Sequence, residues 1–86
     1  MRNRVVAPGQ FETPDLYLAA YLKTAGVLML PVRWLDERHT RCVFVFEDDN
    51  VGSIQRLQLG YINNTERVEA RTYADNIKAL KSLCHI

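Results

Sequence analysis

The sequence has no excess of charge of either sign, because 11 Lys and Arg residues stand against 10 Asp and Glu and the net charge is +1. This balance excludes a general attraction to DNA, RNA or an anionic membrane, so any nucleic-acid surface must be local. Long apolar runs are also missing: residues 24–32 form an uncharged run far shorter than the ~20 residues that span a bilayer. The N-terminal residues lack the apolar core of a signal peptide. We therefore expect a cytoplasmic protein without membrane contact.

Cysteine and histidine are scarce, with two of each in the chain. Cys42 and Cys84 make a poor disulfide framework, and we expect both to be reduced and buried as small hydrophobic residues. No CxxC or HxxxH spacing joins them to His39 and His85, so no metal site is predicted. A glycine-rich phosphate loop and a cysteine in an activating basic context are also lacking. We expect neither a cofactor nor enzymatic activity.

The length is that of one compact domain, because a chain of 86 residues does not bury two separate cores. The apolar pattern begins near residue 11, so the domain is expected over residues 11–86. Residues 1–10 contain a proline and a glycine without any period, and they are predicted to be a flexible arm. A first helix is expected over residues 14–25, with Thr13 as its N-cap.

Two β-rich runs, residues 27–35 and 40–47, flank the short polar sequence DERH and predict an antiparallel hairpin. Pro31 cannot donate a ladder hydrogen bond, which places the first run at a sheet edge or at a bulge. The hairpin is apolar on both faces, so helices of the same chain or a second subunit must cover each side. Helical spacing recurs over residues 54–62 and 72–86. The prediction is an α+β fold of order α-β-β-α-α, a hairpin covered by three helices.

The stretch TRCVFVFEDDN contains two features that often carry chemistry. Glu47, Asp48 and Asp49 could bind a metal, but the acids elsewhere share no spacing with them. A strand end before a helix favours N-terminal capping and compensation of the helix dipole instead. Phe44 and Phe46 alternate as in an RNA-recognition strand, yet the glycine and the second aromatic strand of that motif are missing. We expect both rings in the core.

The predicted hairpin tip brings several cations close to a large aromatic ring. A projecting ribbon of this kind can follow a single-stranded nucleic acid, with guanidinium groups on phosphates and an indole on a base. Asp36 and Glu37 dilute the charge, and a solvated turn with Trp34 packed on the core is the alternative interpretation. The candidate nucleic-acid residues are Arg33, Trp34, Arg38, His39 and Arg41.

The last predicted helix carries a second basic row. Charged residues along one side of an amphipathic helix usually form its solvated face, and we interpret this row in that way. Its members are Arg71, Lys78 and Lys81.

A different class of function is also compatible with the pattern. An edge strand with apolar residues on both faces invites pairing or needs a cover, and the first helix is apolar over more than half of its circumference. A homodimer is favoured over a monomer on these grounds. The candidate protein-interface residues are Tyr17, Tyr21 and Pro31.

Four stretches, FETPDLYLAAYLKTAGV, VFVFEDD, GYINN and YADNIKALKSL, follow one another over residues 11–84. Together they resemble a small uncharacterised domain family seen in bacterial, prophage and phage sequences. The resemblance implies a bacterial or phage setting and supplies no catalytic residues, and the hairpin tip is not part of the shared pattern. We therefore predict a non-enzymatic binding module of bacterial, phage or mobile-element origin that associates with DNA or RNA through the tip. The alternative is a module that binds a host or phage protein, or itself.

Overall fold

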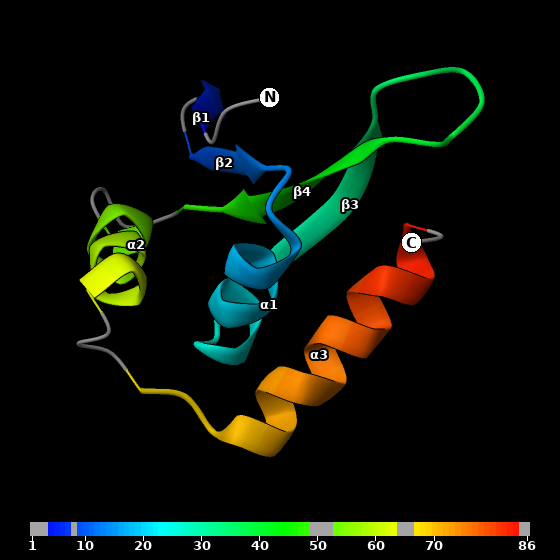
Figure 1. Ribbon diagram of the computed structural model, residues 1–86. Helices are drawn as coiled ribbons and strands as arrows, with labels where there is room; N and C mark the ends of the chain where they lie inside the picture. Colours follow the sequence, from blue (N-terminus) through cyan, green and yellow to red (C-terminus); the bar gives the residue numbers. More distant parts are fainter. Residues whose placement is uncertain (1–3, 8, 49–52, 64–66, 85–86) are drawn as a thin grey trace.

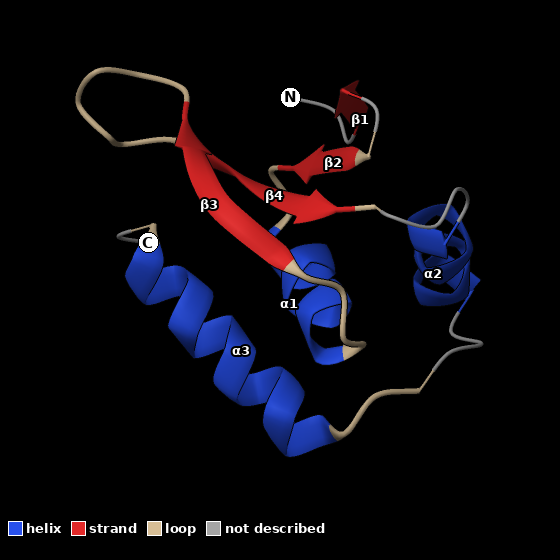
Figure 2. Ribbon diagram, turned by 180° about the vertical axis from the view of Figure 1, so that it is seen from behind, coloured by secondary structure: helices blue, strands red, loops and turns tan. Residues whose placement is uncertain are grey.

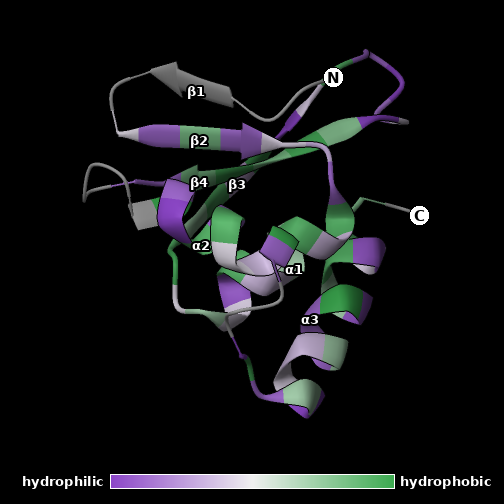
Figure 3. Ribbon diagram, turned by 60° about the vertical axis from the view of Figure 1, so that its left-hand side comes forward, coloured by the Kyte–Doolittle hydropathy of each residue, from purple (hydrophilic) through white to green (hydrophobic). Residues whose placement is uncertain are grey.

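The computed structural model describes residues 4–7, 9–48, 53–63 and 67–84. A four-stranded antiparallel sheet packs there against three helices, which all lie on one side of the sheet (Figures 1 and 3). The predicted α+β class is confirmed. None of the described helices is long and apolar enough to cross a membrane. The elements in chain order are β1 (Arg4–Ala7), β2 (Gln10–Thr13), α1 (Leu16–Thr24), β3 (Met29–Trp34), β4 (Cys42–Glu47), α2 (Ser53–Asn63) and α3 (Ala70–Leu83).

The N-terminal segment differs from the predicted order, because two strands precede α1. Arg4–Ala7, expected in the arm, form β1 and pair with β2, which pairs in turn with β4. The strand order across the sheet is β1-β2-β4-β3 (Figure 2). A strand of four residues contains too few alternations to give a periodic signal, and β4, which pairs with β2, lies far along the chain. The sequence pattern therefore missed both strands.

Helix α1 begins two residues later than predicted. The N-cap is Asp15, whose carboxylate accepts hydrogen bonds from the amides of Tyr17 and Leu18 at 3.0 and 3.2 Å. Thr13, the predicted N-cap, instead ends β2, and its hydroxyl oxygen accepts a hydrogen bond from the Asp15 amide at 3.0 Å. Threonine and aspartate both cap helices well. Because Thr13 pairs with β4 it remains in the strand, and Asp15 becomes the N-cap of the helix. The helix end agrees with expectation, since Gly26 follows the C-cap with a left-handed φ of 93°.

The predicted hairpin is confirmed as β3 and β4. β3 lies at the edge of the sheet, and its register with β4 shifts between Leu30 and Arg33, at Pro31. Both consequences expected of this proline, an edge strand and a bulge, are therefore present. The bulge changes which side chains of β3 share a face, so a simple alternation along residues 27–35 does not hold.

The core lies between the sheet and the helices, and β4 is at its centre. Phe44 and Phe46 are 1% and 0% exposed, so the prediction that they are core residues is confirmed. Because they face the helices, they cannot serve as a base-stacking platform. The helices contribute the buried residues Leu18, Leu22, Ile54 and Leu80 to the same cluster.

The described helices all lie on the other side of the sheet, yet Val43 and Val45 on the opposite face of β4 are also buried. By register Glu12 of β2 lies beside Val45, and Arg33 of β3 lies beside Val43. The Arg33 guanidinium donates from Nε and Nη2 to the two carboxylate oxygens of Glu12, at 2.8 and 2.6 Å. Since β4 lies between β2 and β3, this ion pair crosses over β4. A side-chain pair of the chain itself therefore covers the face for which a helix or a second subunit was expected.

The expectation of reduced cysteines is wrong, because Cys42 and Cys84 form a disulfide. Cys42 is the first residue of β4 and Cys84 is the C-cap of α3, and their Cα atoms are 6.5 Å apart. The two cysteines are 42 residues apart in sequence, and only the packing of α3 against α1 brings the end of α3 to the start of β4. No local sequence signal reports such a contact.

Candidate nucleic-acid interface at the hairpin tip

The loop between β3 and β4, residues 35–41, projects beyond the helices (Figure 1). Its base is closed by the Leu35 amide, which donates to the Arg41 carbonyl at 2.8 Å. Within the loop the His39 amide donates to the Asp36 carbonyl at 3.3 Å. The tip is thus an ordered turn on a projecting ribbon.

Asp36 organises this loop. Its carboxylate accepts hydrogen bonds from the amides of Thr40 and Arg41 at 2.9 and 3.2 Å, and from the Thr40 hydroxyl. The hydroxyl bond is the main cause of a lowered pKa of Asp36, to which the two amide bonds and the charge of Arg41 add. From the sequence alone, Asp36 is expected to dilute the positive charge of the tip. In the structure it fixes the loop that carries the cations.

Trp34 and His39 form a stacked pair at the base of the loop. Their ring centroids lie 4.8 Å apart with an interplanar angle of 16°. His39 has a φ of 55°, in the left-handed region that histidine tolerates better than most residues, and it is exposed, whereas Trp34 is half-buried. One face of the indole is therefore covered by the imidazole.

Trp34 stacks on His39, and the other four candidate residues fall into two groups. Arg33 is held in the ion pair with Glu12 on the outer face of the sheet, and the hydrogen bond to Glu12 raises the pKa of Arg33. It belongs to the fold. Arg38, His39 and Arg41 are exposed on the loop, so the cationic part of the candidate site is smaller than the sequence predicted.

A cavity of about 360 Å³ lies at the base of the loop. Its volume falls in the range of small-ligand pockets, ~300–1,000 Å³. The sequence could not predict this cavity, because residues from four different elements and loops surround it. Its lining consists of Pro14, Leu35, Thr40, Arg41, Cys42, Phe44 and Cys84.

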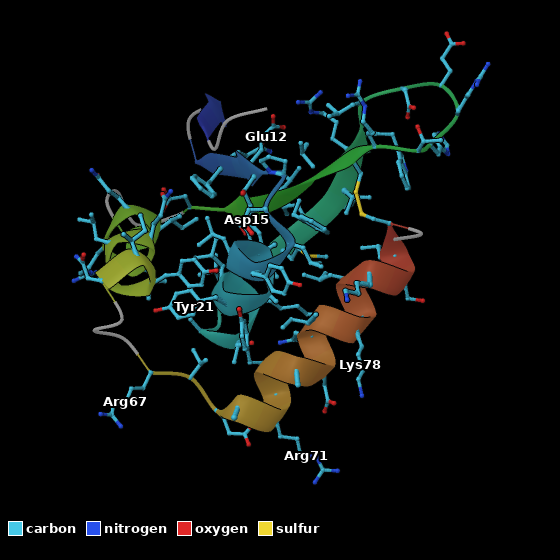
Figure 4. The ribbon with its side chains drawn as sticks, in the orientation of Figure 1. Glu12, Asp15, Tyr21, Arg67, Arg71 and Lys78 are labelled. Atoms are coloured by element: carbon cyan, nitrogen blue, oxygen red, sulfur yellow. A yellow bond between two sulfur atoms is a disulfide. The ribbon has the colours of Figure 1, made fainter. Side chains whose placement is uncertain are left out.

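The candidate protein-interface residues differ in accessibility. Tyr21 is buried, with its ring centroid 5.2 Å from that of Tyr61, and packs inside the domain (Figure 4). Tyr17 is 50% exposed, and Pro31 is exposed on the edge strand β3. Further large hydrophobic residues with exposed side chains are Leu28, Leu59, Ile62 and Leu83.

The basic row of α3 ends next to the candidate site. Arg71 and Lys78 are exposed and point away from α1 (Figure 4), and Lys81 is half-buried in the last turn. The disulfide holds that turn against the start of β4, which directly follows Arg41. From the sequence alone, the basic row of α3 and the hairpin tip are interpreted as separate features.

The structure describes only part of the acidic cluster, Glu47 and Asp48. Asp48 directly follows β4, and its amide donates to the Gly9 carbonyl at 2.7 Å. The described part of α2 begins at Ser53, and the residues between Asp48 and Ser53 lie outside the described part of the chain, so the capping interpretation stays a prediction. Asp49 and His85 lie outside the described residues. Within the described part of the chain no group of three or more His, Cys, Asp or Glu side chains is placed to hold a metal ion.

Comparison with known proteins identifies a family. Residues 9–85 match the model of a family described as Domain of unknown function (DUF5659), and the chain belongs to this family. The predicted resemblance to an uncharacterised family is confirmed in this form. Searches of the curated proteins and of the solved structures find no match.

Proposed function

We propose that this member of the DUF5659 family is a non-enzymatic binding module of bacterial, phage or mobile-element origin, and that its hairpin tip associates with single-stranded nucleic acid in the cytoplasm. The observation that supports the proposal is the arrangement of the tip. Arg38, His39 and Arg41 are exposed on a projecting loop, while Asp36 beside them is fixed by hydrogen bonds within that loop.

The physical basis is phosphate neutralisation by two guanidinium groups. On a single strand each neutralised phosphate lowers log K by about 0.7 per tenfold increase in salt, so Arg38 and Arg41 together contribute about −1.4 to the slope. His39 offers a ring face to one base. Because the contacts are few and none reads a base edge, binding is weak and tolerant of sequence.

The test is a salt series of binding to a mixed-sequence single-stranded oligonucleotide, followed by fluorescence anisotropy. We expect Arg38→Ala/Arg41→Ala to weaken binding for every sequence and to make the slope shallower by about 1.4, with the fold intact. The matched control is Lys23→Ala/Arg56→Ala, which removes two charges from α1 and α2. Arg56 lies on α2, at the end of the molecule opposite to the tip (Figure 1), so the control should bind like the parent. Absence of binding by the parent at low salt would contradict the proposal.

A homodimer through the free edge of β3 is the second candidate function. It is favoured by the exposure of Pro31 on this edge and by the half-exposed ring of Tyr17 on α1. Sedimentation at high micromolar concentration tests it. A dimer that Pro31→Lys dissociates would support this candidate, and a strict monomer would contradict it.

A further inference from the structure

We propose that the Cys42–Cys84 disulfide joins the basic residues of α3 to the hairpin tip, so that the oxidised protein presents one continuous surface for a single nucleic-acid strand. This inference rests on the proposed function and names how that site is extended and regulated. Two separate observations support it, the position of the disulfide and the charge on either side of it.

The disulfide connects the two basic groups at their nearest ends. Arg41, the last residue of the loop, directly precedes Cys42, and Lys81 lies within one helical turn of Cys84. Lys78 is one further turn away, ~9 Å along the helix axis from Cys84 at about 1.5 Å per residue. A strand that passes from Arg41 along the disulfide would next meet the last two turns of α3.

Charge on this surface is available to an anion. Among the described residues the ion pair between Arg33 and Glu12 is the one within 4.0 Å, so Lys78 and Lys81 have no carboxylate partner there. Arg38 and Arg41 also have no described carboxylate within 4.0 Å, although the charge of Arg41 acts on Asp36. Four cations on the two elements can thus neutralise phosphates, whereas the tip alone supplies two.

The position of the end of α3 depends on the disulfide. The first half of α3 is held to α1 by polar contacts: Asn76 Nδ2 donates to Thr24 Oγ1 at 3.0 Å, and the Tyr73 hydroxyl donates to the Tyr17 carbonyl at 3.2 Å. The last turns bury only Leu80 and Cys84, and the 360 Å³ cavity lies beside the disulfide. Apart from Leu80, which packs in the core, cleavage of the S–S bond therefore leaves the last turn of α3 without a covalent link to the start of β4.

The bond is accessible to chemical reduction, because both sulfur-bearing residues line the cavity and Cys42 is only half-buried. A dithiol reductant attacks one sulfur as a thiolate and forms a mixed disulfide. Its second thiol then closes the reductant into its own disulfide. Two electrons and two protons pass to the protein, which is left with two thiols. In a reducing cytoplasm such a bond is a reversible element.

The experiment compares four samples in the salt series: the parent and Lys78→Gln/Lys81→Gln, each oxidised and each reduced with dithiothreitol. At about 0.7 per phosphate, four contacts give the oxidised parent a slope near −2.8, and loss of two gives about −1.4. We expect the reduced parent and the oxidised lysine variant both to show the shallower slope. Reduction of the variant should change its slope no further.

Hydrogen exchange, in the absence of nucleic acid, measures whether the disulfide holds the end of α3 in place. The Cys84 amide, which donates to the Leu80 carbonyl at 3.1 Å, should exchange faster on reduction, while amides of α1 keep their rates. Circular dichroism checks that the reduced protein is folded. If reduction unfolds it, the oxidised lysine variant decides the matter, and a slope equal to that of the parent overturns the inference.

The outcomes separate the two proposals. If the oxidised parent binds and loses 1.4 of slope with Arg38→Ala/Arg41→Ala but none with Lys78→Gln/Lys81→Gln, the joined surface is wrong and the tip stands as the site. If the oxidised parent does not bind even at low salt, the proposed function fails and the inference fails with it.

Discussion

Phe44 and Phe46 on one face of β4, and Val43 and Val45 on the other, are all buried, but different structures cover them. Three helices cover the phenylalanine face, and close packing of apolar side chains excludes water there. On the valine face the Glu12–Arg33 ion pair lies across the strand. A strand with two apolar faces therefore requires neither two layers of helices nor a second subunit. A cation beside a candidate site can likewise belong to the fold.

The largest effect should come from the phenylalanine face. We expect Phe44→Ala to destabilise the protein by roughly 3 to 5 kcal/mol, because the loss of the ring leaves a cavity in a packed core. Chemical denaturation measures the change. A variant that melts within a degree or two of the parent would show that the ring is not buried, and it would revive the base-stacking interpretation.

The disulfide at the end of this face should have the next largest effect. It closes a loop between residues 42 apart, for which the chain-entropy model gives about 4 kcal/mol, and measured values are typically 2 to 4 kcal/mol. The free energy of unfolding of the oxidised protein should exceed that of the reduced protein by about 2 to 4 kcal/mol. The double change Cys42→Ser/Cys84→Ser is the control: its stability should match the reduced parent and should not respond to reductant. Equal stability in both redox states would mean that the bond does not form in solution.

A substitution on the valine face should destabilise the protein less, and its effect should come from the loss of a charged partner. Arg33→Met removes the guanidinium that offsets the burial of the Glu12 carboxylate, so we expect melting roughly 5 to 10 °C below the parent. Arg38→Met, which removes the same group from the exposed loop, is the matched control and should melt within ~2 °C of the parent. Similar melting of the two variants would show that the ion pair does not support the outer face.

The smallest effect concerns the loop and its pH dependence. The pKa of Asp36 is lowered in the folded protein, mainly by the Thr40 hydroxyl, so this contribution is present above the ordinary aspartate pKa of about 3.9. It is lost as the pH falls from there through the lower folded value. The amides of Thr40 and Arg41 should therefore lose protection from hydrogen exchange in acid before the core does. Asp36→Asn should remove this pH dependence, and an unchanged profile would contradict the role given to the carboxylate.

Features encoded by neighbouring residues could be predicted from the sequence. The hairpin, the edge position of Pro31, the left-handed Gly26 and the buried pair Phe44 and Phe46 all follow from local period or backbone chemistry. Each depends on a few adjacent positions.

Features that depend on distant residues could not be predicted. The strands β1 and β2 are too short for a periodic signal. The Arg33–Glu12 pair joins residues 21 apart, and it removes one cation from the predicted site. The disulfide joins residues 42 apart, and it holds the last turn of α3 against the start of β4. Tertiary contacts of this kind have no local pattern, so the candidate site was predicted less well than the fold.

The role of the loop cations is tested most directly by the salt slopes of Arg38→Ala/Arg41→Ala and Arg33→Met in the oxidised protein, at a temperature where both are folded. We expect the parent to bind a single strand, the double variant to lose about 1.4 of slope, and Arg33→Met to bind with the slope of the parent although it is less stable. Loss of slope in Arg33→Met with none in the double variant, or no binding by the parent at low salt, would show that the loop cations do not form the site.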